Sequence, residues 1–320
     1  MKNRLRLSIF AGVLLAGCSV LAVQFAPRKR AVGVRREAAT QADELFWKIL
    51  HGGEYERIPD ALAVLTAAYL ESPGDSITAS HIGFLHIWRL AERSRLDGAP
   101  ATITDHAVLA RKYFEESVRL NPSDARVLGF LAAAMLAEAT IHKDETLKRR
   151  GYYTLRDAIH EWPEFNYFTA GYVMSGEPAD SARFKEALEW QWQTLDECAQ
   201  EKVDRHNPGY AKYMRLETKT GRKRVCWNSW IAPHNFEGFF LNMGDMLVKS
   251  GDWRTGQRIY ASATLSPTYW SWKFRGALEQ RIREASENVS RFNTGQDRTG
   301  EVGSRIMFSS RFACMACHQK

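Results

Sequence analysis

One pattern of residue sizes recurs along the chain at helical spacing. A small residue is followed four positions later by a large apolar one, three later by another small one, and then by a proline. It occurs at Ala61, Leu65, Ala68 and Pro73; at Ala110, Phe114, Ser117 and Pro122; at Gly151, Leu155, Ala158 and Pro163; and, shortened, at Gly256, Tyr260, Ala263 and Pro267. Small side chains let two helices approach, the large one fills the gap between them, and proline ends the helix. The chain therefore predicts packed helix pairs.

A second helical pattern lies between these segments. It includes Ile82-Gly83 within residues 76–91, then Leu128, Leu131, Ala132 and Met135, and later Phe240, Met243, Gly244 and Leu247. Together the two patterns resemble the tetratricopeptide repeat, a helix–turn–helix unit of about 34 residues. The resemblance covers about residues 40–285. It implies an all-α, antiparallel helix-hairpin repeat solenoid whose concave groove binds protein partners.

The repeat is irregular in several places. The proline spacings of 49 and 41 residues predict insertions around residues 94–105 and 141–150. Residues 201–235 form a long connection that contains the basic run Arg222-Lys223-Arg224. Its aromatic residues Tyr210, Trp227 and Trp230 either line a haem edge or, more simply, cover the repeat core. Residues 286–313 are polar and rich in Gly, Ser and Asn, which predicts a linker within an irregular C-terminal segment, 286–320.

The N-terminus carries the pattern of an export signal. Three basic residues precede a run of 20 uncharged, mostly apolar residues, 7–26. Within this run, the Leu-Ala-Gly-Cys sequence that ends at Cys18 resembles a bacterial lipobox, which implies lipidation of Cys18. The alternatives are an uncleaved membrane anchor, since about 20 residues at ~1.5 Å each cross a ~30 Å hydrocarbon layer, and simple secretion. The first two interpretations tether the chain to a bacterial membrane on its periplasmic side through a basic linker, 27–39.

The C-terminus carries two cysteines three positions apart, followed at once by a histidine. Cys314-x-x-Cys317-His318 resembles the attachment motif of c-type cytochromes. In that motif both thiols add to the vinyl groups of a haem and the histidine is the proximal iron ligand. The resemblance implies one covalent haem c, held by Cys314 and Cys317 and ligated by His318. A thioredoxin-like pair is a weaker interpretation, because only three residues follow Cys317 where a helix is required. A structural zinc site needs a fourth ligand from elsewhere, and a terminal disulfide would close a short, strained loop.

A second axial iron ligand must come from upstream or from another chain. The candidates are Met307, Met243, Met246, His206 and His234. Met307 lies seven residues before Cys314, and an extended chain spanning about 3.3 Å per residue can carry it round the ring edge. For Met243 and Met246, core packing is the simpler interpretation, and His206 is expected in an exposed loop.

The two remaining cysteines, Cys198 and Cys226, are candidates for a disulfide. Cys198 falls at the end of a predicted helix, 180–199, and the closed loop holds about 28 residues. Such a bond requires an oxidising compartment, as export predicts. Free thiols are the alternative.

Net charge gives little support to a nucleic-acid partner. The chain has a formal charge of +7, but eight of its 44 basic residues and none of its 37 acidic residues lie in residues 1–36. The remainder is near neutral, which removes the composition argument for nucleic-acid binding. The adjacent carboxylates Asp144-Glu145 and Asp196-Glu197 are expected on solvated helix faces, and Trp190, Trp192, Trp270 and Trp272 are expected to fill helix pairs.

These features predict a membrane-tethered periplasmic cytochrome that carries electrons to or from a docked redox partner, rather than a catalyst. The alternative is an assembly scaffold of an exported complex, in which the haem is structural or senses redox state or gas. A peroxidase is a weaker third possibility.

Overall fold

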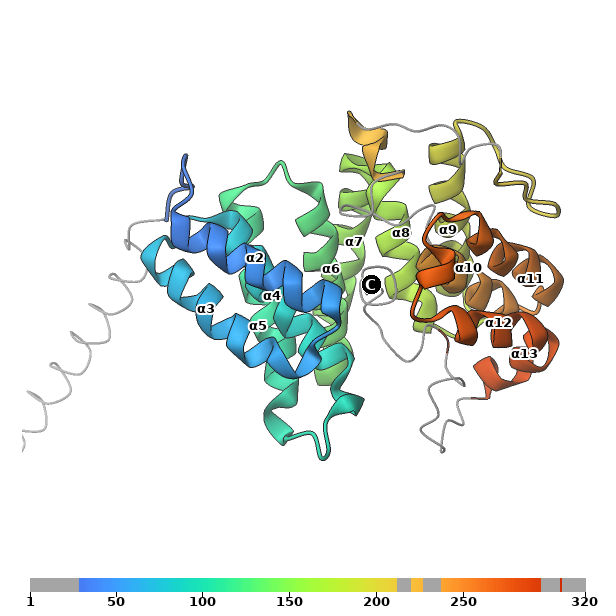
Figure 1. Ribbon diagram of the computed structural model, residues 1–320, viewed down its shortest axis with the longest axis horizontal. Coiled ribbons are helices and arrows are strands. Elements are labelled where there is room, and N and C mark those ends of the chain that lie inside the picture. Colours follow the sequence, from blue (N-terminus) through green and yellow to red (C-terminus); the bar gives the residue numbers. More distant parts are fainter. Residues whose placement is uncertain (1–28, 212–219, 227–236, 295–305, 307–320) are drawn as a thin grey trace, which may run out of the picture.

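The protein is described by a computed structural model at residues 29–211, 220–226, 237–294 and 306. Over these residues every regular element is helical, which confirms the all-α class (Figure 1). Twelve α-helices are present in the described part of the chain: α2 (Glu37–Gly52), α3 (Ile58–Glu71), α4 (Ser76–Ala91), α5 (Asp105–Leu120), α6 (Ala125–His142), α7 (Glu145–Glu161), α8 (Pro163–Val173), α9 (Ala182–Ala199), α10 (Glu237–Lys249), α11 (Trp253–Ala261), α12 (Arg275–Arg283) and α13 (Ala285–Asn293).

The helices pack as successive pairs. α2 packs on α3, α4 on α5, α6 on α7, α8 on α9, and α10 on α11, and each pair also contacts the next. α13 closes the array by packing on both α10 and α11. Figure 1 shows the pairs arranged along the longest axis of the molecule, with α2 and α3 at one end and α11 to α13 at the other.

Close approach within the pairs depends on glycines that face large side chains. A Cβ atom added at Gly83 of α4 would lie 2.9 Å from the ring of Phe114 on α5. At Gly244 of α10 it would lie 2.2 Å from Cδ1 of Tyr260 on α11. Real Cβ atoms do not approach other atoms so closely, so these pairs require glycine. Phe114 and Tyr260 are the large members of the repeated sequence pattern, and both are fully buried.

α9 carries the same spacing with a polar residue in the large position. Ala187, Gln191 and Thr194 are all fully buried on one helix face. The Gln191 side-chain amide donates to the Phe168 carbonyl at 3.3 Å, and a Cβ at Gly171 would lie 2.7 Å from Gln191 Nε2. The pair α8–α9 therefore continues the array, although its sequence lacks the apolar signal.

The predicted insertion at 141–150 is wrong. α6 continues to His142 and α7 begins at Glu145, so these residues lengthen two helices. Asp144 caps α7 by accepting from the backbone N–H groups of Thr146 and Leu147, both at 2.9 Å. By contrast, residues 94–105 do form a connection, with short 3-10 turns at Arg93–Arg95 and Ala101–Thr104.

The array also extends past the predicted boundary at residue 285. α13 covers Ala285–Asn293, where a linker was expected. Its buried residues Ala285, Asn288 and Phe292 recur at spacings of three and four, so a largely polar segment still forms an amphipathic helix.

A buried polar cluster ties this last part of the array together. The Tyr260 hydroxyl donates to Asp245 Oδ1 at 2.5 Å, and Arg281 Nε lies 3.3 Å from the same oxygen. The Arg281 guanidinium also lies 4.6 Å from the ring centre of Phe292. These contacts link α10, α11, α12 and α13 through groups that are almost completely buried.

One helix in the described part of the chain is long and apolar enough to cross a membrane by those two criteria. It is α6, and more than half of its apolar window is buried against neighbouring helices. Its apolar composition is accounted for by its place in the core.

Candidate functional site

The predicted haem motif lies outside the described residues. This holds for Cys314, Cys317, His318 and Met307, and also for Cys18, His234, Trp227 and Trp230. The covalent haem, its proximal ligand and the lipidation of Cys18 therefore stay predictions.

Ile306 is the described residue nearest to the motif, eight positions before Cys314. It is half-buried and packs against two apolar clusters that meet between α8, α9 and α10. One cluster contains Leu195, and the other contains Met174. Because a chain extends by at most about 3.6 Å per residue, the backbone of Cys314 stays within about 29 Å of the Ile306 contact.

Three of the candidate distal ligands lie in the described chain. Met243 and Met246 of α10 have no exposed surface and belong to these same two core clusters. Neither thioether can reach an iron atom unless the core opens. His206 is exposed in the loop after α9, where its backbone N–H donates to Asp204 Oδ1 at 2.8 Å. Of these three side chains, only His206 is accessible.

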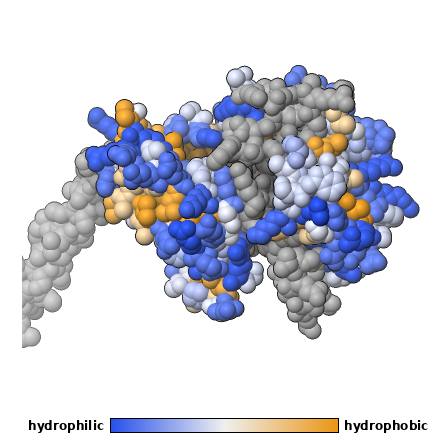
Figure 2. Space-filling view, in the orientation of Figure 1, coloured by the Kyte–Doolittle hydropathy of each residue, from blue (hydrophilic) through white to orange (hydrophobic). Residues whose placement is uncertain are grey.

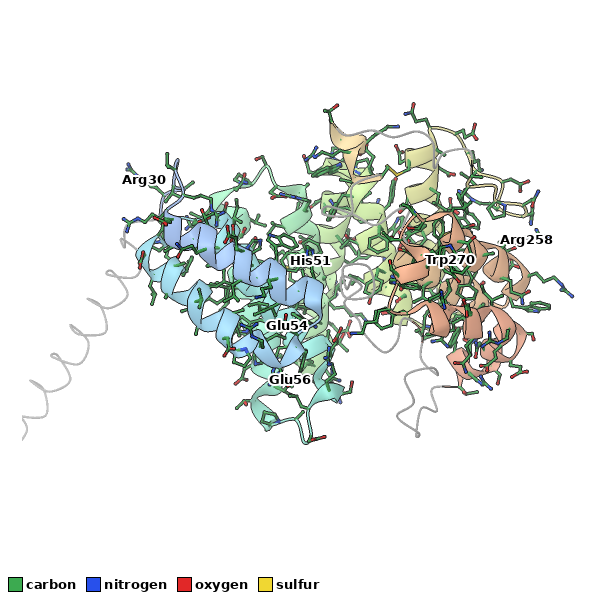
Figure 3. The ribbon with its side chains drawn as sticks, viewed as in Figure 1. Arg30, His51, Glu54, Glu56, Arg258 and Trp270 are labelled. Carbon is green, nitrogen blue, oxygen red and sulfur yellow. A yellow bond between two sulfur atoms is a disulfide. The ribbon has the colours of Figure 1, made fainter. Side chains whose placement is uncertain are left out.

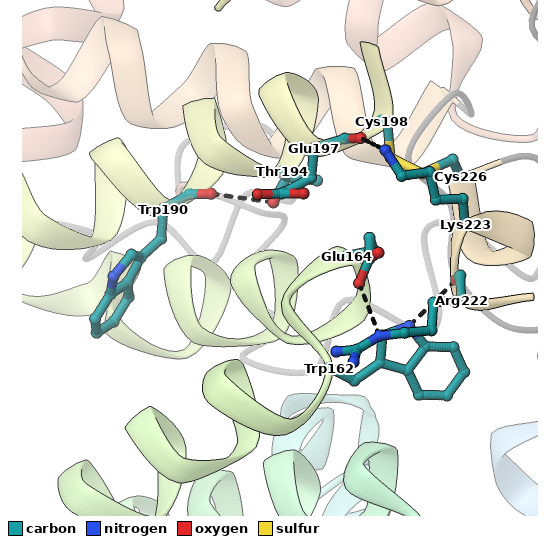
Figure 4. The surroundings of a disulfide bond; sticks show 9 residues. All are labelled: Trp162, Glu164, Trp190, Thr194, Glu197, Cys198, Arg222, Lys223 and Cys226. Atoms are coloured by element: carbon teal, nitrogen blue, oxygen red, sulfur yellow. Dashed lines mark hydrogen bonds and ion pairs between the residues drawn. A yellow bond between two sulfur atoms is a disulfide. The ribbon is translucent and has the colours of Figure 1, made fainter. Parts of the chain in front are cut away.

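Cys198 and Cys226 are joined by a disulfide (Figure 4). Their Cα atoms are 5.7 Å apart, and the bond links the end of α9 to a 3-10 turn at Arg222–Cys226. Both residues are buried in a small cluster with Trp162 and Phe165. The bond consumes two of the five thiols, which leaves Cys18, Cys314 and Cys317 for other chemistry.

The basic run beside the disulfide binds helix ends. Lys223 Nζ donates to the Glu197 carbonyl of α9 at 2.9 Å (Figure 4). Arg222 Nη2 donates to the Glu161 carbonyl of α7 at 2.6 Å. Arg224 lies over the ring of Trp162, with 4.6 Å between the guanidinium carbon and the ring centre. Cations at helix C-termini satisfy carbonyls that have no partner inside the helix. These side chains therefore hold the connection in place.

The first part of the connection is fixed in the same way. Asp196 of α9 accepts from the Val203 backbone N–H at 2.8 Å and pairs with Arg205 Nη2 at 2.6 Å. Tyr210 is buried, and its ring centre lies 5.6 Å from that of Phe240. The expectation that Asp196 only occupies a solvated face is wrong, and Tyr210 covers the repeat core.

Two histidine contacts were not predicted from the sequence, one with a second histidine and one with an aspartate. His86 Nδ1 and His106 Nδ1 lie 2.9 Å apart between α4 and α5. Burial, reinforced by His106, lowers the pKa of His86 to about 3. His81 Nδ1 lies 2.8 Å from Asp43 Oδ1. No spacing rule joins residues 20 or 38 positions apart.

These pairs do not extend into a metal site. Among the described residues there is no group of three or more His, Cys, Asp or Glu side chains that could hold a metal ion. A neutral imidazole pair at this depth is typical of packing.

The prediction that Trp270 packs inside a helix pair is wrong. Trp270, which is labelled in Figure 3, lies in a 3-10 turn and is 75% exposed. Trp272 is buried. Arg275 lies over the Trp270 ring at 5.5 Å from its centre. The tryptophan therefore covers surface outside the core.

Comparison with known proteins identifies no relative of this chain. No protein-family model, curated protein or solved structure matches this chain.

Proposed function

We propose that this chain is a membrane-tethered periplasmic c-type cytochrome with one covalent haem, which carries electrons to or from a docked protein. The observation that carries the proposal is the sequence Cys314-x-x-Cys317-His318. Its chance expectation in a chain of this composition is about 0.002, far below one occurrence. The helix pairs are proposed to be a tetratricopeptide-like array that binds the partner.

The cysteine chemistry of the described chain supports this assignment. The disulfide between Cys198 and Cys226 is typical of an oxidising compartment, as export predicts. With those two sulfurs bonded to each other, Cys314 and Cys317 remain as the thiol pair with the spacing of haem attachment. These two thiols, followed by His318, therefore fit a covalently attached haem.

In this proposal Cys314 and Cys317 would hold the haem through their thiols, and His318 and Met307 would be ligands of its iron. When bound, the haem supplies a one-electron iron couple. The contact of Ile306 with the core clusters limits the proposed attachment site to within about 29 Å of α8, α9 and α10.

The burial of Met243 and Met246 favours a second candidate function. With these two thioethers in the core, two of the five candidate distal ligands are removed from the iron. An iron with an open sixth position would suit an assembly scaffold that senses redox state or gas.

Absorption spectra of the membrane-extracted protein, produced with haem maturation machinery, test both candidates. A low-spin, six-coordinate spectrum in both redox states supports electron transfer, with Met307→Ala converting it to a high-spin form. Met243→Leu is the matched control and should leave the spectrum unchanged. A high-spin, CO-binding spectrum in the unsubstituted protein supports the sensor. A protein without haem bands contradicts both.

A further inference from the structure

The outer face of α3 is apolar along most of its length. Its exposed central positions are Ala63, Val64, Ala67 and Leu70, and the exposed charges Asp60 and Glu71 lie at the two ends. Leu70 is 74% exposed and Val64 is 42% exposed. Figure 2 shows this face as an apolar band over α3.

The outer faces of the equivalent helices carry charges between their apolar residues. α5 exposes Lys112 and Arg119 as well as Leu109, and α7 exposes Arg149, Arg156 and Asp157 as well as Tyr153. All three helices hold the same place in their pairs and carry the same buried pattern. Clustered apolar residues on one outer face mark a contact with another molecule or with lipid. The apolar face of α3 is therefore a property of the first helix pair.

The segment that leads towards the N-terminus is docked at the same end of the array. Lys29 Nζ lies 3.0 Å from Glu116 Oε1, and Arg119 Nη1 donates to the Lys29 carbonyl at 2.9 Å. The Val32 N–H donates to the Gly74 carbonyl, in the turn that follows Leu70, at 3.1 Å. These contacts fix the point at which the chain leaves the array.

Arg35 secures the segment at its other end. Its Nε lies 2.8 Å from Asp75 Oδ2, and its Nη1 also binds Asp43. Asp75 caps α4 and Asp43 belongs to α2, so the guanidinium joins the docked segment to two helices.

The apolar N-terminal run ends close to this point. Residue 26 closes that run and lies three positions before Lys29, so at most about 11 Å of chain separates them. Val32, Val34 and Ile77 at this end of the array are all exposed. Exposed apolar side chains beside a membrane anchor fit the lipid interface.

Two cations of the docked segment complete this surface. Within the described residues, the exposed side chains of Arg30 and Arg36 form no ion pair, whereas Lys29 and Arg35 are paired. Exposed arginines next to apolar residues suit anionic headgroups. Figure 3 shows Arg30 at the opposite end of the molecule from Arg258.

We propose that residues 29–36 and the outer face of α3 lie against the anionic surface of the membrane that tethers the chain. The inference rests on the proposed tether and deepens it, because it assigns the array a fixed orientation. α3 lies in the interface, and α10 to α13 are held at the far end of the long axis, where a partner can reach them.

Hydroxyl-radical footprinting of the full chain in phosphatidylglycerol-containing vesicles tests the orientation. Leu70, which is 74% exposed, is the probe, and Leu109, which is 37% exposed, is the internal reference of the same residue type. On a free surface Leu70 is oxidised about twice as fast as Leu109, in proportion to their exposed fractions. Against the membrane, the ratio falls below one.

Charge reversal at the docked segment gives the matched comparison. Arg30→Glu with Arg36→Glu should return the ratio towards two, while Arg254→Glu with Arg258→Glu at the far end should leave it low. Two results overturn the orientation and leave the tether intact. One is a ratio near two in chains that stay with the vesicles, and the other is Leu70 protection that grows with protein density, which identifies a second copy. A chain that leaves the vesicles on alkaline washing contradicts the tether, and with it the orientation.

Discussion

Loss of the Cys198–Cys226 disulfide should destabilise the part of the array that contains α9. The bond closes a loop with a sequence separation of 28 residues. In the chain-entropy description, a cross-link over that length removes about 12 cal/mol/K of entropy from the unfolded chain. At 25 °C this corresponds to about 3.6 kcal/mol of stabilisation of the folded state.

The measurement compares oxidised protein, reduced protein and the variant Cys198→Ala with Cys226→Ala in urea unfolding followed by circular dichroism. Reduction should lower the free energy of unfolding by about 3–4 kcal/mol. Both cysteines are buried, so the variant loses some packing in addition. Reductant should not change the variant further, which separates the cross-link from other effects of the reagent.

Two results would refute this reasoning. One is an equal free energy of unfolding in the oxidised and reduced protein, which would mean that the cross-link does not constrain the unfolded chain. The other is two free thiols at residues 198 and 226 in protein isolated from its native compartment. That result would also remove the support that the disulfide lends to export.

Three further predictions concern packing and pH. Gly244→Ala places a methyl group against Tyr260 and should cost about 1–3 kcal/mol, whereas Gly276→Ala, which meets nothing within 4 Å, should stabilise α12 by about 0.5–1 kcal/mol; thermal unfolding of both compares them. The pKa of His86 is lowered to about 3, so protonation favours the unfolded state, and stability should decrease as pH falls from about 6.5 towards 3, at up to about 1.4 kcal/mol per pH unit. In His86→Leu, the urea midpoint of unfolding should fall less steeply with decreasing pH over that range. Hydrogen bonds from the neighbouring cations lower the pKa of Glu116 to about 2. The ion pair of Glu116 with residues 29–36 should therefore be intact above about pH 4.5 and weaken as the pH falls towards 2. Hydrogen exchange in residues 29–36 should become faster over that range, and unchanged exchange would contradict the prediction.

The periodic part of the fold could be predicted because it rests on local spacing. The small and large residues around Leu65, Phe114, Leu155 and Tyr260 are buried at helix contacts, where their pattern placed them. The pattern fails where a polar residue takes a packing role. In α9 the polar residue Gln191 stands where the pattern requires a large apolar residue, although its amide is fully buried between two helices.

The polar helix ends were harder to predict for a related reason. α13 has few apolar residues, and only its contacts with α10 and α11 show that Asn288 and Phe292 form one buried face. The proline spacing makes residues 141–150 look like an insertion, yet Asp144 caps a helix there. Helix capping, unlike hydrophobic spacing, depends on a single side chain and one or two backbone groups.

In the candidate site, too, some contacts could be predicted from the sequence and others could not. The pairing of Cys198 with Cys226 was accessible because the other three cysteines had stronger assignments. The contacts between His86 and His106, and between Asp43 and His81, depend on how α2, α4 and α5 cross. Exposure of Trp270 beside buried Trp272 likewise follows from a short 3-10 turn that spacing does not reveal.

The central claim is that Cys314 and Cys317 carry a covalent haem. The most direct measurement is the mass of the C-terminal tryptic peptide, residues 312–320, which follows Arg311 and contains the complete motif. The account predicts a peptide heavier by one haem group in protein isolated from its exported compartment, and the loss of that mass in Cys314→Ala with Cys317→Ala. A peptide that carries two free thiols, or an internal disulfide, and no haem would contradict the account.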